Sequence, residues 1–135
     1  MKKLKRSLAV FIIGAAGYTL IEILWRGYSH ISMAVAGGIC FSLLYFVQRY
    51  LKIPFFLKCI LGTLVISVIE LAAGVILNIF LRLNVWDYSH EYMNILGQVC
   101  LKYSLLWLLL CISIFGMLGS IERFRRTLNE KKTDT

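Results

Sequence analysis

The residue best placed to do chemistry in this sequence is a single acidic side chain inside a long apolar run. Glu70 lies at the midpoint of residues 59–81. If that run is a helix, a rise of 1.5 Å per residue places Glu70 roughly 16 Å from either end. A carboxylate at that depth in a bilayer is costly unless it is protonated, paired or facing water. Glu70 therefore predicts either a functional site or a bond to a neighbouring helix.

A second group of ionisable side chains recurs along one expected helix. Glu22, Arg26 and His30 are spaced four residues apart. Glu22 and Arg26 would share a helix face, where they can form an ion pair, and Gly27 is expected to interrupt the helix before His30. Two interpretations stay open: an ion pair that keeps Arg26 near the membrane surface, or one wall of a polar pocket. The other expected members of that pocket are Asp87, His90 and Asn94.

The third candidate is the motif Trp86-Asp87-Tyr88-Ser89, within the polar stretch 82–98. Asp87 is expected to accept backbone N–H bonds at the start of a following helix, or to pair with Arg26 or Arg82. A Glu/His/Asp set can also bind a metal, but no two of these residues have the close spacing of a ligand pair. We therefore predict no metal and no cofactor. Residues 82–98 fit either a plain loop or a segment that re-enters the membrane.

Four long apolar runs must position these groups. They cover residues 8–24, 31–47, 59–81 and 99–118, and about 20 helical residues cross the hydrocarbon core of a bilayer. Of the 135 residues, 59% are hydrophobic and 16% are charged, which is too apolar for a soluble domain of this length. We predict an all-α polytopic membrane protein, with four transmembrane helices in residues 1–120 and a basic cytoplasmic tail in residues 121–135.

The positive charges are distributed unevenly along this pattern. Of the 15 Lys and Arg residues, only Arg26, Arg82 and Lys102 flank one set of helix ends, and the remaining twelve flank the other. Because Lys and Arg accumulate on the cytoplasmic side, we predict that both termini are cytoplasmic. Residues 121–128 are expected to lie as an amphipathic helix along the anionic inner leaflet. The net charge of +8 therefore points to membrane lipids as partners and not to nucleic acid.

The sequence also contains an internal repeat. Residues 28–40 read YSHISMAVAGGIC and residues 88–100 read YSHEYMNILGQVC, with Tyr, Ser, His, Met, Gly and Cys at matching positions. The repeat predicts two duplicated helical hairpins in parallel orientation, with sites at the interface between them. Alternatively, Ser29 and Ser89 are only helix N-caps, and the Tyr and His residues are interfacial anchors.

Motifs for nucleotide or hydrolytic chemistry are missing from the sequence. It has no Walker A sequence, no G-x-S-x-G and no H-E-x-x-H, so we expect a chain that does not hydrolyse ATP and is not an enzyme. Gly37-Gly38, and Gly14 with Gly17, are expected to bring helices into close contact. The four cysteines form no C-x-x-C pair and are expected to pack as small apolar side chains.

Two stretches carry a family resemblance. The first is residues 22–33 with 37–41, and the second comprises Glu70, Gly74, residues 84–89, residues 94–101 and Trp107. Over residues 14–120 the sequence resembles the short bacterial members of the putative ABC-transporter type IV (CmpB-like) membrane family. It departs from the family pattern at Tyr92, where Pro is usual, and at Ile31, where Trp is common. The resemblance implies a permease-type protein of the bacterial inner membrane, and it implies no particular substrate.

The residues that match the family's motif positions form the predicted binding site: Glu22, Arg26, His30, Glu70, Trp86, Asp87, Tyr88, Ser89, Asn94 and Gly97. The leading hypothesis is a small transporter or permease component that acts as a homo-oligomer or with a partner membrane protein. One alternative is a non-transporting membrane protein that binds a partner or a lipid. Another is a membrane-embedded enzyme acting on a lipid headgroup. That enzyme would need four side chains to converge within hydrogen-bond reach, namely Glu22, His30, Asp87 and His90.

Overall fold

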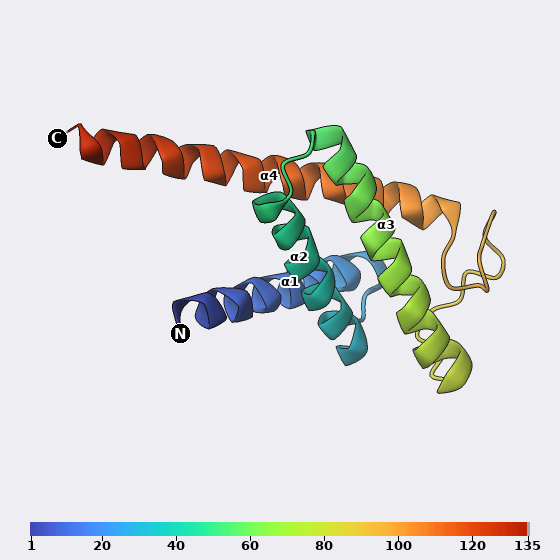
Figure 1. Ribbon diagram of the computed structural model, residues 1–135. Coiled ribbons are helices and arrows are strands. Elements are labelled where there is room, and N and C mark those ends of the chain that lie inside the picture. Colours follow the sequence, from blue (N-terminus) through green and yellow to red (C-terminus); the bar gives the residue numbers. More distant parts are fainter. Residues whose placement is uncertain (135) are drawn as a thin grey trace.

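Each of the four apolar runs forms a helix (Figure 1). The computed structural model describes residues 1–134. All four spans are long and apolar enough to cross a membrane, so the prediction of an all-α, multi-pass membrane protein is confirmed. The elements are α1 (Lys2–Arg26), α2 (Ile31–Tyr50), α3 (Phe55–Gly74) with its π-helical continuation η1 (Val75–Phe80), and α4 (Leu101–Thr133).

Local backbone chemistry sets the turn between α1 and α2. Gly27 ends α1 with a left-handed φ of 82°, and its amide donates to the Ile23 carbonyl at 2.8 Å. Glycine favours this conformation, as the sequence predicted. His30 then caps α2, because its Nδ1 accepts a hydrogen bond from the Ser32 amide at 3.2 Å. The interpretation of Ser29 as the cap of this helix is therefore wrong.

The link between α3 and α4 is a folded segment without a helix. We call residues 81–100 the connecting segment. Within the described chain it contains turns and an isolated antiparallel bridge between Ile95 and Val99. It follows η1, whose wider helical turns end where the Leu81 amide donates to the Ile76 carbonyl at 2.9 Å. Ser89 lies well before α4 begins, so the interpretation of Ser89 as a helix cap is also wrong.

The last helix is longer than a membrane span. α4 has 33 residues and passes residues 120–121 without a break. A helix of this size is about 50 Å long, whereas the hydrocarbon core of a bilayer is about 30 Å thick. The C-terminal third of α4 therefore extends beyond the other helices, as Figure 1 shows.

Glycines bring α1 and α2 into close contact. Added Cβ atoms at Gly14, Gly37 and Gly38 would lie 2.4 Å, 2.4 Å and 2.7 Å from side-chain atoms of the facing helix. At such distances only glycine allows the backbones to approach. Gly17 differs, because a Cβ added there meets nothing within 4 Å. The prediction of close contact is confirmed for the first three glycines and wrong for Gly17.

Among the helix backbones, the α1–α2 hairpin meets α3 and α4 only through α2 in the described chain. Buried side chains of α2, α3 and α4 form one core cluster: Leu44, Val47, Cys59, Ile66, Cys111 and Phe115. In the described chain, no Cα atom of α1 comes within 8 Å of a Cα atom of α3 or α4. The backbones of α1 and α4 therefore do not touch each other; in Figure 1, α1 passes behind α2 and α4 passes behind α3.

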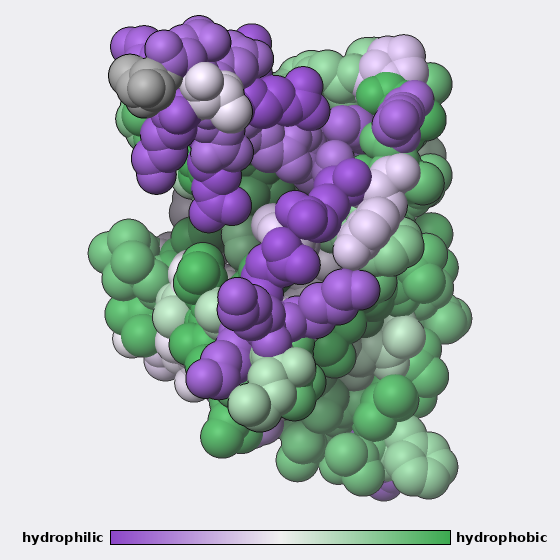
Figure 2. Space-filling view, turned by 60° about the vertical axis from the view of Figure 1, so that its left-hand side comes forward, coloured by the Kyte–Doolittle hydropathy of each residue, from purple (hydrophilic) through white to green (hydrophobic). Residues whose placement is uncertain are grey.

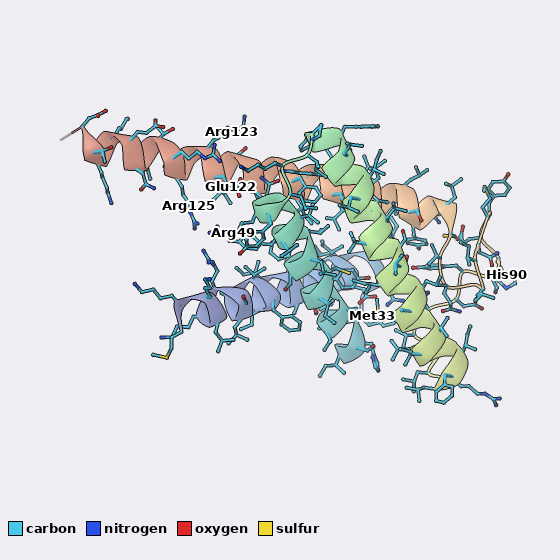
Figure 3. All side chains as sticks on the ribbon, viewed as in Figure 1. Met33, Arg49, His90, Glu122, Arg123 and Arg125 are labelled. Carbon is cyan, nitrogen blue, oxygen red and sulfur yellow. The ribbon has the colours of Figure 1, made fainter. Side chains whose placement is uncertain are left out.

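Apolar side chains cover the outside of the helices, as lipid contact requires. Leu24, Ile31 and Phe80 are each more than three-quarters exposed, and hydrocarbon tails match such surfaces where water would not. Figure 2, viewed toward the end that carries both termini, shows hydrophilic residues gathered there. Arg49, Glu122, Arg123 and Arg125 lie toward this end in Figure 3, and His90 lies at the far end.

Replacing Gly37 by Leu should separate α1 from α2. The new Cβ atom would lie 2.4 Å from the Tyr18 Cβ atom, and overpacking of this kind costs about 1–3 kcal/mol. We expect Gly37→Leu to lower the thermal unfolding midpoint of the purified protein in detergent. Gly17→Leu adds the same side chain to the same hairpin at a position where its Cβ atom meets nothing within 4 Å, and it should leave the midpoint near that of the wild type. Equal midpoints for the two variants would contradict the packing described above.

Candidate functional site

Glu70 lies inside the bundle with both carboxylate oxygens occupied. Tyr88 of the connecting segment donates its hydroxyl to Oε1 at 3.1 Å, and Trp107 of α4 donates its indole N–H to Oε2 at 2.9 Å. The residue is only 7% exposed. These donors meet the need of a buried carboxylate for hydrogen bonds. The prediction of a bond to a neighbouring helix is confirmed, and the partner on that helix is Trp107.

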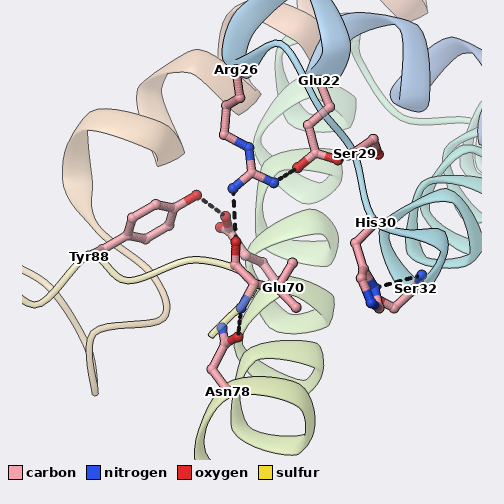
Figure 4. A network of polar contacts seen from close by, with 9 residues as sticks. Glu22, Arg26, Ser29, His30, Ser32, Glu70, Asn78 and Tyr88 are labelled. Atoms are coloured by element: carbon pink, nitrogen blue, oxygen red, sulfur yellow. Dashed lines mark hydrogen bonds and ion pairs between the residues drawn. The ribbon is translucent and has the colours of Figure 1, made fainter. Parts of the chain in front are cut away.

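Glu22 and Arg26 form the ion pair that their spacing predicted (Figure 4). The second Glu22 oxygen accepts a hydrogen bond from the Ser29 hydroxyl at 2.7 Å. Arg26 also donates from Nη1 to the Val85 carbonyl at 3.0 Å, and its guanidinium lies 5.0 Å from the centre of the Tyr28 ring. This arginine therefore ties the end of α1 to the connecting segment.

Amide side chains attach the connecting segment to η1. Asn78 accepts a hydrogen bond from the Val85 amide at 2.7 Å and donates to the Gln98 side chain at 2.7 Å. The Trp86 indole donates to the Gln98 backbone carbonyl at 3.0 Å. Asn78 and Gln98 are both buried. Gly74 leaves the space that Gln98 fills, since an added Cβ atom would lie 2.5 Å from Gln98 Oε1.

A tight turn then presents Tyr88 to Glu70. Asn94 donates to the Ser89 and Glu91 carbonyls at 3.2 and 3.0 Å and accepts from the Gly97 amide at 3.0 Å. Gly97 has a left-handed φ of 69°, which favours glycine, and its carbonyl accepts from the Tyr88 amide at 2.8 Å. Ser89, Asn94 and Gly97 therefore shape the backbone around Tyr88.

Asp87 has a local role that the sequence did not predict. Its carboxylate accepts a hydrogen bond from the Ser89 amide at 2.9 Å. Hydrogen bonds from Ser89 hold the pKa of the Asp87 carboxyl below its usual range. The expectation that Asp87 caps α4 is wrong, because α4 starts at Leu101 after Cys100. In residues 1–134 Asp87 forms no ion pair with Arg26 or with Arg82.

Two cavities lie between the helices. The first, the Glu70 cavity, has a volume of about 230 Å³ and a mostly apolar lining that includes Gly17, Tyr18, Met33, Cys40, Glu70 and Trp107. The second, the Arg26 cavity, has a volume of about 330 Å³ and is lined by residues that include Tyr18, Glu22, Arg26, Trp86, Tyr88 and Trp107. Tyr18 and Trp107 line both, with their ring centres 6.0 Å apart. Each cavity has the size of a small ligand or part of one.

The predicted site residues therefore fall into two groups. Five line a cavity: Glu22, Arg26, Glu70, Trp86 and Tyr88. The others line neither and act on the backbone: His30, Asp87, Ser89, Asn94 and Gly97. Of the pocket expected to join Glu22 with Asp87, His90 and Asn94, Glu22 lines the Arg26 cavity and the other three line neither of these two cavities. Within residues 1–134 no hydrogen bond joins any two of Glu22, His30, Asp87 and His90.

Sequence reasoning missed several residues that hold the site together. They are Tyr18, Asn78, Gln98 and Trp107. Asn78 had a usable signal, because it lies eight residues after Glu70 in the same apolar run, close to two helical turns away. Gln98 and Trp107 had another, because both belong to the stretches that carry the family resemblance, although neither was predicted as a site residue. Tyr18 had none, because an aromatic residue in an apolar helix reads as ordinary packing.

One protein family matches most of the chain. Residues 33–134 match the family described as Putative ABC-transporter type IV. The chain belongs to this family. Residues of the matched range include Glu70, Trp86, Tyr88 and Trp107, whereas Glu22, Arg26 and His30 precede it. No curated protein matches the chain. No solved structure matches it either.

In this family member, a methyl group at Gly74 should dislodge the connecting segment. Gly74→Ala would push a Cβ atom against Gln98, which must leave its place beside Asn78. We expect faster hydrogen–deuterium exchange at the backbone amides of Val85 and Tyr88, both of which are hydrogen-bonded within this arrangement. Gly116→Ala is the matched control, because a Cβ atom there meets nothing within 4 Å. Unchanged exchange in Gly74→Ala would contradict the role of Gln98.

Proposed function

We propose that this protein is the membrane-embedded component of a transporter and binds its solute in the two cavities between the helices. One observation carries the proposal. The carboxyl group of Glu70 lines a cavity while its hydrogen-bond donors come from two other parts of the chain, Tyr88 and Trp107. A solute that bonds to Glu70 or to one of these donors would therefore act directly on the contacts that hold the helices and the connecting segment together.

The hydrogen bond from Tyr88 to Glu70 is the contact through which solute binding would be coupled to movement of the connecting segment away from the helices. A hydrogen bond to a charged group contributes about 1.5–3 kcal/mol. A solute that takes over the hydrogen bond of Tyr88 offsets that loss, so the arrangement in which Tyr88 has left Glu70 gains population when solute is bound. The Tyr88 side chain is also stacked on Tyr103 of α4 at 4.5 Å between ring centres, so its displacement would reach both the connecting segment and α4.

The internal repeat supports a site between two related hairpins. In each half, the Tyr-Ser-His motif donates a hydrogen bond to an acidic residue of the helix before it: Ser29 to Glu22, and Tyr88 to Glu70. We take the α1–α2 and α3–α4 pairs as duplicated units, the second with a longer connection. Sites at the interface of such repeats are common in transporters.

The remaining parts of the proposal concern energy and partners. The family description names an ABC transporter, and this sequence lacks a Walker A motif, so nucleotide hydrolysis would take place on a separate chain. Four helices rarely enclose a pathway alone, and we therefore expect a homo-oligomer or a partner membrane protein. The chain is proposed as a transporter component rather than an enzyme.

We place both termini in the cytoplasm. The count of twelve Lys and Arg residues against three supports this orientation, as does the position of both chain ends at one end of the molecule (Figure 1). In intact bacterial cells, a cysteine added after residue 135 should resist a membrane-impermeant maleimide, and a cysteine replacing the exposed Tyr92 should react. The opposite labelling pattern would reverse the orientation.

Replacing Glu70 by Gln should slow transport. The glutamine side chain keeps the shape but replaces one acceptor oxygen by an NH2 group, so Tyr88 and Trp107 can no longer both donate to it, and a change of 1.36 kcal/mol alters a rate tenfold. We expect roughly a tenfold lower rate in proteoliposomes offered labelled amino acid, sugar, nucleoside and single-chain amphiphile under an imposed proton gradient. The wild type should move at least one of them faster than protein-free liposomes do.

The control for this experiment is Glu130→Gln, which makes the same chemical change on the exposed end of α4.

A second candidate function is the docking of a partner on that end, favoured by the exposed Phe124 beside Arg123, Arg125 and Arg126 on an unbroken helix. If no solute moves, Glu70→Gln changes nothing, and deletion of residues 121–135 removes a stoichiometric partner in pull-downs, the docking function replaces the transport proposal.

A further inference from the structure

The two cavities open toward the lipid, between α1 and α4. Side chains along this opening are apolar and exposed: Ile13 at 60% and Trp25 at 63% on α1, and Leu109 at 61% and Met117 at 50% on α4. All four line one of the cavities. The backbones of α1 and α4 stay more than 8 Å apart between Cα atoms throughout the described chain. In a bilayer this opening therefore faces hydrocarbon and not water.

The two cavities differ in chemistry along the same opening. None of the described residues that line the Glu70 cavity is basic, and most of them are aliphatic or aromatic. The Arg26 cavity adds hydrogen-bonding groups, including Tyr103 and Ser113 on α4, and Arg26 is the only basic side chain of residues 1–134 that lines either cavity. A ligand that occupies both needs a long apolar part and a polar end.

Arg26 has hydrogen-bonding capacity left for such a polar end. Its guanidinium carries five N–H donors. In the described chain one bond is made from each terminal nitrogen, to Val85 and to Glu22, and Nε has no partner. Because the Glu22 carboxylate already balances the charge of Arg26, an added group is held mainly by hydrogen bonds, and oxygen acceptors suit a guanidinium best.

We propose that the protein binds a single-chain amphiphile with an anionic oxygen head, a carboxylate or a phosphate, that enters sideways between α1 and α4. The apolar chain lies in the Glu70 cavity and the head lies beside Arg26. Only together do cavities of about 230 and 330 Å³ lie well inside the range of small-ligand sites, roughly 300–1,000 Å³, which favours one chain over a two-chain lipid. This assignment names the substrate class of the proposed transporter and rests on that proposal.

The tryptophans of the protein provide a built-in reporter of this site. The sequence contains three, Trp25, Trp86 and Trp107, and all of them line the Arg26 cavity. A fatty acid brominated on its chain quenches tryptophan emission on contact. Added to the protein in nanodiscs of unbrominated lipid, it should quench the emission with a saturable component above the linear background from the lipid-facing surface.

Gly17 allows the Glu70 cavity to be filled without disturbing the packing. It lines that cavity, and a Cβ atom added there meets nothing within 4 Å. We expect Gly17→Leu to lower the apparent affinity of the saturable component at least tenfold. Gly116→Leu is the matched control, because its added Cβ atom is equally free of contacts and it lines neither cavity; it should bind as the wild type does.

Equal quenching in the wild type and in both variants would overturn the proposal, because the chains would then touch only the outer surface. If Gly17→Leu fails to fold, Ala36→Leu fills the same cavity from α2 and takes its place. The methyl ester of the brominated acid lacks the anionic oxygen and should bind at least tenfold more weakly. An ester that binds equally well overturns the assignment of the head. A brominated single-chain phospholipid, compared with the acid, decides between phosphate and carboxylate.

The outcomes separate this inference from the transport proposal. Saturable binding without movement of any solute in proteoliposomes would contradict the transport proposal and still support the amphiphile-binding site. Movement of another solute, with no saturable quenching by any brominated amphiphile, would overturn the inference alone.

Discussion

A carboxyl group in the middle of a membrane-spanning helix must find hydrogen-bond donors, because lipid offers none. In this protein the donors of Glu70 are the Tyr88 hydroxyl and the Trp107 indole. Meeting that requirement fixes α4 against α3 and brings the connecting segment down onto both. The turn around Gly97, which positions Tyr88 through its carbonyl, is then as much a part of the Glu70 environment as the helix on which Glu70 lies.

The helix contacts are of two kinds, and glycine takes part in both. At Gly37 and Gly38 the absence of a side chain allows α1 and α2 to touch, and this contact needs no hydrophobic effect, since lipid tails are as apolar as the helices. At Gly17 the same absence leaves space that no side chain fills. One hairpin is thus closely packed within itself and loosely attached to the other, with α2 as the shared wall.

Much of the fold followed from length, hydropathy and local spacing, and most of the site did not. Run length was enough to identify the four spans, four-residue spacing identified the Glu22–Arg26 pair, and Gly27 marked the end of α1. The connecting segment escaped prediction because its shape depends on left-handed φ values at residues that do not favour them, such as Leu96. The partners of Glu70 escaped because hydrogen bonds 18 and 37 residues apart have no signature in spacing.

The sequence separation of the Glu70 donors also has a consequence for how the chain is made. α1 and α2 contain all the residues of their own contact, so they can pair as soon as both have left the ribosome. Glu70 has to wait. Its second donor, Trp107, is synthesised 37 residues later, which at translation rates of roughly 5–20 residues per second takes about 2–7 s. During that interval the Glu70 carboxyl group lacks the Trp107 hydrogen bond. The insertion machinery must therefore keep this group away from lipid until the fourth span has been made.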